Sequence, residues 1–267
     1  MSNQKYSDDA LGTESIWKLI VKMTIPCIMA QIVNLLYNIV DRIYIGNMPE
    51  VGKDALAGLG LCMPILTIIM AFSGFVSGGG APLASRALGE GNREKAHKII
   101  GNSFVLLVFF AVVLSAVAFV FKEKILYAIG ASETTYQYAN EYLTIYLMGT
   151  LFVQLSVGLN VFITAQGKST LAMISTLIGA VLNIALDPLF IFTFEMGIKG
   201  AAIATIISQG VSAVFVMAVL MSKKASLRLT FSGMKLDFRI IGSIMALGVA
   251  QFVMMATESV IGFALNG

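Results

Sequence analysis

The sequence predicts an all-α polytopic membrane protein, on the strength of its composition, its long apolar runs and its distribution of charge. Of the 267 residues, 57% are hydrophobic and 12% are charged, and the mean hydropathy is +0.85. A soluble domain carries about 25% charged residues. Continuous apolar runs favour helices over a membrane barrel, because barrel strands have about ten residues of alternating character.

Seven apolar segments are long enough to cross a bilayer, which needs roughly 20 residues per helix. We place them at about 16–46, 55–85, 99–121, 136–165, 171–194, 200–221 and 240–265. The first, second and fourth are long enough to tilt or to extend past the membrane. Because the connections at 47–54, 166–170 and 195–199 are short, we expect consecutive helices to be antiparallel neighbours.

The basic residues are distributed unequally between the two sides of these spans. With the N-terminus inside, 13 of the 18 Lys and Arg residues lie on inner segments and 5 toward the outside. This bias follows the positive-inside rule and predicts a multi-pass plasma-membrane protein with a cytoplasmic N-terminus. Residues 1–15 are polar and lack the apolar core of a cleaved signal peptide. The net charge of +3 needs no nucleic-acid partner to explain it.

Four acids lie within the predicted spans: Asp41, Glu141, Asp187 and Glu258. Asp41 and Asp187 fall at similar depth in the outer half of the membrane, and each has an amide about one helical turn away. A charge at the bilayer centre costs from about 2.5 to over 10 kcal/mol, so acids inside spans mark functional sites. Burial favours a protonated carboxyl, whereas a bound cation favours the ionised form. The pair is therefore predicted to hold either a proton or a cation, which is the chemistry of ion coupling.

Polar side chains form stripes on four spans. Helical spacing groups Gln31, Asn34, Asn38 and Asp41 in the first span, Tyr142 and Asn160 (five turns apart) in the fourth, Asn183 and Asp187 in the fifth, and Thr205, Gln209 and Ser212 in the sixth. Lipid cannot satisfy these groups, so the stripes should face the interior. They either line a cavity or only hydrogen-bond the helices together.

Other local signals give weaker expectations. Pro188 should bend the fifth span and free the carbonyl of Ile184 for an ion or a water molecule. Cys27 and Cys62 have no metal-ligand spacing and are expected to be small packing residues. The GKST sequence at 167–170 lacks the first glycine of a phosphate-binding loop, because Phe162 stands in its place.

A faint internal repeat divides the chain. MAQIVNLLYN (29–38) aligns with VAQFVMMATE (249–258), and the second copy follows a basic segment. We therefore predict a cytoplasmic N-terminal segment at 1–15, a six-helix lobe at 16–221, a cytoplasmic inter-lobe linker at 222–239 and the first helix of a second lobe at 240–267. The sequence FALNG at 263–267 suggests a cut end, so the rest of that lobe is expected from the same longer chain; the alternative is a half-length subunit that dimerises.

Three stretches resemble the multidrug and toxic compound extrusion (MATE) family, close to its DinF-like branch: PCIMAQIVNLLYNIVDRIYIG (26–46), GGAPLASRALGEGNREKA (79–96) and LNIALDPLFIF (182–192). The resemblance covers essentially the whole chain. It implies the N-terminal lobe of a twelve-helix antiporter that exports hydrophobic, often cationic compounds in exchange for H+ or Na+. It implies no enzymatic activity and no cofactor beyond the coupling ion.

The resemblance also implies roles for particular residues. Asp41, Asn183, Asp187 and Thr205 match the positions around the coupling ion, where a Na+ would bind. Gln31, Asn34, Tyr37, Asn38, Tyr142 and Asn160 are the residues that we expect to line the substrate cavity. Glu258 resembles an acid that some branches use in the second lobe.

Two other functions fit parts of the pattern. A lipid-linked precursor flippase shares the architecture, but it would favour a cavity rich in Arg and Lys, and Arg42 is the one such residue inside a span beyond the inner end of the first. An intramembrane aspartyl protease could use Asp41 and Asp187 as a dyad, but such enzymes carry a GxGD-type motif, whereas Asp187 stands in ALDP.

Overall fold

The computed structural model describes the backbone of residues 15–266 and the side chains of residues 15–257. Its helices, in chain order, are α2 (Ile16–Gly46), α3 (Gly52–Gly89), α4 (Arg93–Ala128), α5 (Glu133–Met148), α6 (Thr150–Ala165), α7 (Ser169–Pro188), α8 (Gly197–Met221) and α9 (Phe238–Asn266). A π-helical turn (Leu189–Thr193) follows α7, and a 3-10 turn (Phe231–Met234) lies between α8 and α9. The predicted segment 1–15 lies almost wholly outside the described residues.

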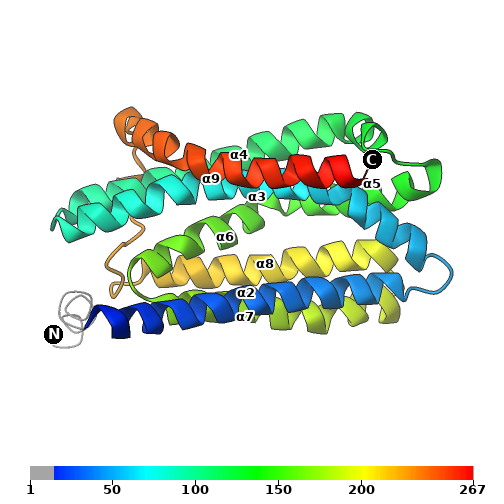
Figure 1. Ribbon diagram of the computed structural model, residues 1–267, viewed down its shortest axis with the longest axis horizontal. Helices are drawn as coiled ribbons and strands as arrows, with labels where there is room; N and C mark the ends of the chain where they lie inside the picture. Colours follow the sequence, from blue (N-terminus) through cyan, green and yellow to red (C-terminus); the bar gives the residue numbers. More distant parts are fainter. Residues whose placement is uncertain (1–14, 267) are drawn as a thin grey trace.

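The helices run nearly parallel to one long axis and form two groups (Figure 1). In one group α3 packs against α4 and α9; in the other α2 packs against α7, and α7 against α8. Helix α6 contacts α3, α4, α7 and α8, and so joins the groups. Two apolar clusters fill the interior, one around Leu59, Tyr142 and Leu143 and one around Phe162, Ile100 and Leu220.

The predicted number of spans is confirmed. Six helices are long and apolar enough to cross a membrane, and α5 with α6 supplies a seventh if this bent pair counts as one span. All seven coincide with the predicted segments. The α2 start, the 89–93 turn and the α8–α9 connection share one end of the molecule, hereafter the linker end, whereas the 46–52 and α7–α8 turns share the opposite end (Figure 1).

The fourth span is broken, which the sequence pattern did not predict. Helices α5 and α6 meet at Gly149 at an angle of 61°. A Cβ atom on Gly149 would lie 2.4 Å from Cγ1 of Ile206 on α8, so only glycine allows this approach. The expectation that Tyr142 and Asn160 share one face across five turns is therefore wrong, because no continuous helix joins them.

Helix α9 lies directly against α3 through glycine contacts. A Cβ on Gly79 would lie 1.9 Å from the carbonyl oxygen of Ile244, and a Cβ on Gly248 would lie 1.9 Å from that of Phe75. Small residues let helix backbones approach closely in membranes. This contact fixes where α9, the predicted start of a second lobe, sits on the first six spans.

Candidate functional site

The two predicted acids lie together inside the bundle. Asp41 on α2 is 8% exposed and Asp187, near the end of α7, is fully buried. Helices α2 and α7 pack along each other, and the Asp187 carboxyl interacts electrostatically with that of Asp41. Two anions in one buried site repel each other unless a proton or a cation is shared between them. A proton or a cation bound between them would relieve that repulsion.

Helices α7 and α8 supply the polar surroundings of Asp187. The Nδ2 atom of Asn183 donates to Oδ1 of Asp187 at 3.1 Å and contacts Oγ1 of Thr205 at 3.4 Å. The side chain of Tyr142 on α5 interacts with Thr205 and, electrostatically, with Asp41. Four helices therefore converge on the pair, and the four predicted ion-site residues Asp41, Asn183, Asp187 and Thr205 form one cluster.

Several oxygens of this cluster have no hydrogen-bond donor. Among the described residues, Oδ1 of Asp41, Oδ2 of Asp187 and Oδ1 of Asn183 are buried without a partner. Buried polar atoms in proteins are nearly always satisfied by protein, water or an ion. Carboxylate and amide oxygens suit a hard cation such as Na+, and a carboxylate oxygen equally suits a proton. Within the described part of the chain, no three His, Cys, Asp or Glu side chains are grouped so that they could hold a metal ion.

The backbone changes from α-helix to π-helix at this cluster. Helix α7 ends at Pro188, directly after Asp187, and the Leu189–Thr193 turn closes with Phe194 N–H donating to the Leu189 carbonyl at 2.9 Å. Proline supplies no N–H to the ladder, and π-helical turns are frequent at functional sites. The structure therefore shows a change of helix type after the proline, whereas the bend of the fifth span and the free Ile184 carbonyl stay predictions.

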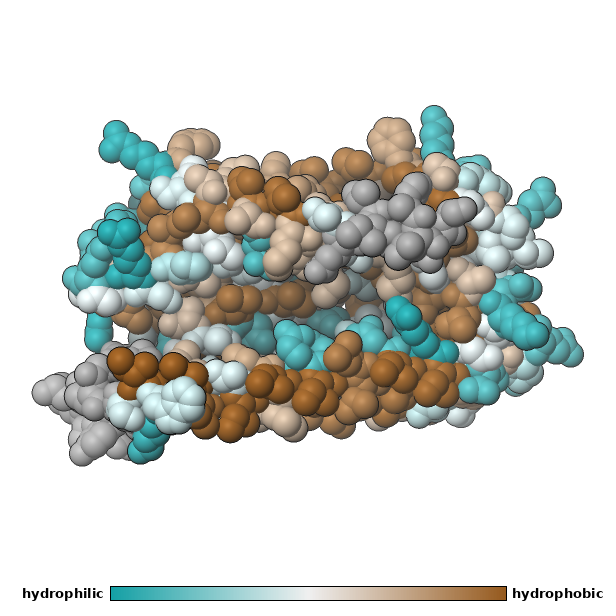
Figure 2. All heavy atoms as spheres, in the orientation of Figure 1, coloured by the Kyte–Doolittle hydropathy of each residue, from teal (hydrophilic) through white to brown (hydrophobic). Residues whose placement is uncertain are grey.

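A polar cavity of about 260 Å³ extends from this cluster toward the linker end, between α2, α6, α7 and α8. Asn183, Thr205 and Tyr37 line the end beside the acids, and Ser169 and Cys27 line the other. Nothing charged is among the residues that line it. In Figure 2, the face of the molecule is hollowed above the hydrophobic row along α2, and hydrophilic residues are visible inside.

The cavity separates the predicted lining residues into two sets. Gln31, Asn34, Tyr37 and Asn160 line it, whereas Asn38 and Tyr142 do not. Asn38 is exposed, and its Nδ2 donates to the Asn34 carbonyl of its own helix at 2.7 Å, so it needs no interior partner. Tyr142 is buried in the apolar core beyond the bend at Gly149. Cys27 and Cys62 also differ: Cys62 is fully buried, whereas Cys27 is half-buried at the cavity wall.

The stripes missed several cavity residues of α7 and α8. Ser169, Thr176 and Asn183 recur every seven residues along α7 and lead to Asp187, a spacing that the sequence carries. Ser208 and Ser169 are 2% exposed, and their hydroxyl oxygens, with Oδ1 of Asn160, have no partner among the described residues. Unsatisfied polar groups therefore continue from the acid pair along the cavity, which is typical of a hydrated chamber.

Comparison with known proteins identifies the family. The MatE family model matches residues 26–189 of this chain. The chain belongs to the MatE family. The multidrug export protein MepA of Staphylococcus haemolyticus (strain JCSC1435) is 27% identical over 252 residues, which are 94% of this chain and 55% of MepA. MepA of Staphylococcus saprophyticus is 25% identical over 252 residues, which again are 94% of this chain and 55% of the relative.

Solved structures match the fold closely. A structure described as "protein A" has a TM-score of 0.91 at 34% identity and covers 97% of this chain and 58% of its own. The outward-facing conformation of a multidrug resistance MATE family transporter of the MOP superfamily has a TM-score of 0.84 at 26% identity and covers 91% of this chain and 53% of its own. The structure described as the inward-facing conformation of a multidrug resistance MATE family transporter has a TM-score of 0.80 at 25% identity and covers 92% of this chain and 55% of its own. This chain therefore has about half of a MATE fold and spans about half the length of its curated relatives.

Proposed function

We propose that this chain forms the N-terminal lobe and the start of the second lobe of a secondary active multidrug efflux antiporter. The transporter exchanges hydrophobic, often cationic compounds against H+ or Na+ across the plasma membrane. The MatE membership and the multidrug export named for the MepA relatives support the transport class. The observation that carries the coupling role is the acid pair, Asp41 and Asp187, buried together with one unsatisfied oxygen on each carboxyl.

The proposed cycle depends on how many positive charges the pair holds. A proton, or a Na+ held by Asp41, Asn183, Asp187 and Thr205, relieves the repulsion between the two carboxylates. Relief lets α2 and α7 pack more closely beside the acids. Asn183 and Thr205 line the cavity as well as the acid cluster, so ion occupancy changes the cavity wall and expels the substrate. The second lobe supplies the rigid-body movement that alternates access.

The cavity is proposed to bind the exported compound through Gln31, Asn34, Tyr37 and Asn160. Its wall mixes aliphatic and neutral polar groups, which suits large amphipathic molecules. A flippase for pyrophosphate-linked precursors would instead need Lys or Arg in the wall, and none lines this cavity. The linker end is proposed to be cytoplasmic because 13 of 18 basic residues map to that side in our assignment. The DinF-like branch stays a prediction from the three sequence stretches.

The test uses the complete transporter that contains this sequence. Dye efflux from vesicles is measured under an imposed pH gradient and, separately, under an imposed Na+ gradient, which identifies the driving ion. Asp41→Asn and Asp187→Asn should each abolish gradient-driven efflux, because an amide cannot exchange a proton or supply a charged ligand. Asp54→Asn, which changes an exposed acid at the start of α3, is the control and should transport normally. Persistent coupled efflux in both buried variants would refute the assignment.

A further inference from the structure

The connection between α8 and α9 is packed firmly onto the first six spans. We call residues 222–237 the strap. Within it Leu227 is fully buried and Leu229 is 3% exposed, and Leu229 N–H donates to the Leu220 carbonyl at 2.9 Å. A flexible inter-lobe linker would be solvated and would not bury leucines. Two buried amides from the lobe, Gln166 and Asn102, explain how this segment is held.

Gln166 at the end of α6 holds the first half of the strap. Its side chain is almost fully buried, and its Oε1 accepts from the backbone N–H of Ser226 at 2.9 Å and of Leu227 at 3.1 Å. Its Nε2 donates to the Phe162 carbonyl at 3.1 Å, which fixes the orientation of the amide. One side chain thus satisfies two backbone donors that have turned away from regular secondary structure.

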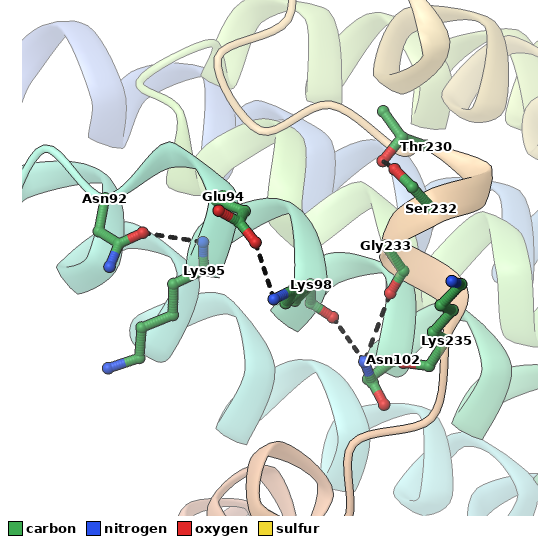
Figure 3. A network of polar contacts seen from close by, with 9 residues as sticks. All are labelled: Asn92, Glu94, Lys95, Lys98, Asn102, Thr230, Ser232, Gly233 and Lys235. Atoms are coloured by element: carbon green, nitrogen blue, oxygen red, sulfur yellow. Dashed lines mark hydrogen bonds and ion pairs between the residues drawn. The ribbon is translucent and has the colours of Figure 1, made fainter.

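Asn102 on α4 holds the second half (Figure 3). Its side chain is fully buried; Nδ2 contacts the carbonyl oxygens of Lys98 at 2.8 Å, Lys235 at 3.1 Å and Gly233 at 3.4 Å. Its Oδ1 accepts from the backbone N–H of Asp237 at 2.9 Å. Every polar atom of this side chain is therefore used, three of the four contacts reaching the strap or its junction with α9.

The backbones of α4 and the strap touch at glycines. A Cβ on Gly101 would lie 2.2 Å from the Gly233 carbonyl oxygen, and a Cβ on Gly233 would lie 2.4 Å from the His97 carbonyl oxygen. Such contacts admit no side chain on either residue. The strap therefore cannot shift along α4 without losing both the close contact and the hydrogen bonds of Asn102.

Asp237 passes this fixed geometry to α9. Its Oδ1 accepts from the N–H of Arg239 at 3.0 Å and of Ile240 at 3.3 Å, so Asp237 caps the start of α9. The same residue is held through its own N–H by Asn102. The route from α4 to α9 is thus Asn102, Asp237 and the first turn of α9, with no unrestrained residue between them.

We propose that Asn102 and Gln166 are positioning residues that make the strap a rigid pivot, so that the linker end of α9 keeps its place on the first lobe throughout the transport cycle. The inference rests on the proposed function in one respect, namely that α9 is the first helix of a second lobe. The second lobe then rocks about an anchored linker end, and the strap does not act as a slack tether between the lobes.

Hydrogen exchange on the complete transporter tests the anchoring. In the wild type, the peptide that covers 224–237 should exchange slowly. Gln166→Leu removes the acceptor of Ser226 and Leu227 and should speed exchange of that peptide about tenfold. Gln166→Glu keeps an acceptor oxygen and should preserve most of the protection. Gln154→Leu is the matched control: Gln154 is equally buried on α6 and donates to the Ile69 carbonyl, away from the strap. Fast exchange in the wild type would overturn the proposal, as would equal protection in Gln166→Leu.

A distance measurement tests rigidity first in a transporter that keeps both anchoring amides. Spin labels are attached at Glu90→Cys and Ser232→Cys, both exposed, in a transporter carrying Cys27→Ala and Cys62→Ala that still effluxes dye. The label separation should stay unchanged when the driving ion is added or removed, and Asn102→Leu should broaden it. A separation that shifts with the driving ion means that the strap moves, which overturns the inference. This readout does not depend on Asp41 or Asp187, so failure of the coupling assignment would be seen separately.

Discussion

Replacing Asn183 by leucine tests the acid cluster most directly. Among the described residues, Asn183 is the one that donates a side-chain hydrogen bond to Asp187, at 3.1 Å, and it also contacts Thr205. Leucine has a similar shape, so Asn183→Leu removes the amide without opening a large cavity. Asp187 is fully buried, so the lost donor is not replaced by another side chain among the described residues.

The expected size of the effect follows from the charge on the acceptor. A hydrogen bond to a charged group contributes about 1.5–3 kcal/mol, which corresponds to roughly a tenfold to 150-fold change in a binding constant. If Na+ is the driving ion, its half-saturating concentration should rise by that factor, because the ionised carboxylate loses its donor and the site loses Oδ1 of Asn183. If H+ is the driving ion, the protonated acid is favoured, the proton is released too slowly and maximal efflux should fall.

The assay is dye efflux from vesicles as a function of the driving-ion concentration, with the complete transporter. Asn38→Leu is the matched control, because Asn38 is an exposed amide whose side-chain contacts, to the Asn34 carbonyl and to Tyr37, both lie on its own helix and reach neither acid. It should leave the ion dependence within about twofold of the wild type, as is usual for surface changes below 0.5 kcal/mol. The reasoning is refuted if Asn183→Leu behaves like the wild type, or if Asn38→Leu loses as much.

Three further predictions concern packing and the cavity. In Gly79→Ala, the new Cβ atom would lie 1.9 Å from the Ile244 carbonyl oxygen, and the helices must separate until that distance is about 3.4 Å, which should cost about 1–3 kcal/mol of stability in thermal unfolding. The control is Gly60→Ala, whose Cβ would have no atom within 4 Å and which should leave the stability unchanged. Equal melting temperatures of the two variants would contradict this prediction. Gly149→Ala should lower the stability of the protein by a similar amount. Adding Ile206→Ala should restore part of the lost stability, because the new Cβ atom clashes with the Ile206 side chain. If the double variant shows no recovery, the contact between Gly149 and Ile206 is not the cause. Asn160→Leu removes the hydrogen bonds to Ala172 and Thr176 and should weaken dye efflux without changing its dependence on the driving ion. The control is Val181→Leu, which alters a side chain 57% exposed on α7 and should change neither property. A shifted ion dependence in Asn160→Leu would argue against separate roles for the cavity wall and the acid cluster.

The sequence predicts the membrane class and the spans well, because hydropathy is a property of contiguous residues. Intramembrane acids are rare, so the pattern alone singles out Asp41 and Asp187, each with an amide about one turn away; it was the resemblance to the family that added Thr205 to the predicted site. The prediction is less successful for the cavity wall. Asn38 has the right periodicity but satisfies itself on its own helix, and Ser169 and Ser208 are ordinary residues that become important only through burial.

The strap shows the same division. Its basic composition predicts a cytoplasmic linker, and nothing local distinguishes Asn102 or Gln166 from any other amide near the end of a span. Their role arises because backbone groups of residues far along the chain come within 3.4 Å of them.

Hydropathy and charge within a span can be read from contiguous residues, because each span must satisfy its own backbone hydrogen bonds in lipid. These two properties predict the seven spans and the two acids at similar depth. Which polar groups meet depends on helix rotation, breaks and crossing points, and these are set by contacts between distant residues. The bend at Gly149 against Ile206, the meeting of Asp41 with Asp187 and the anchoring of α9 through Asn102 were decided by that packing.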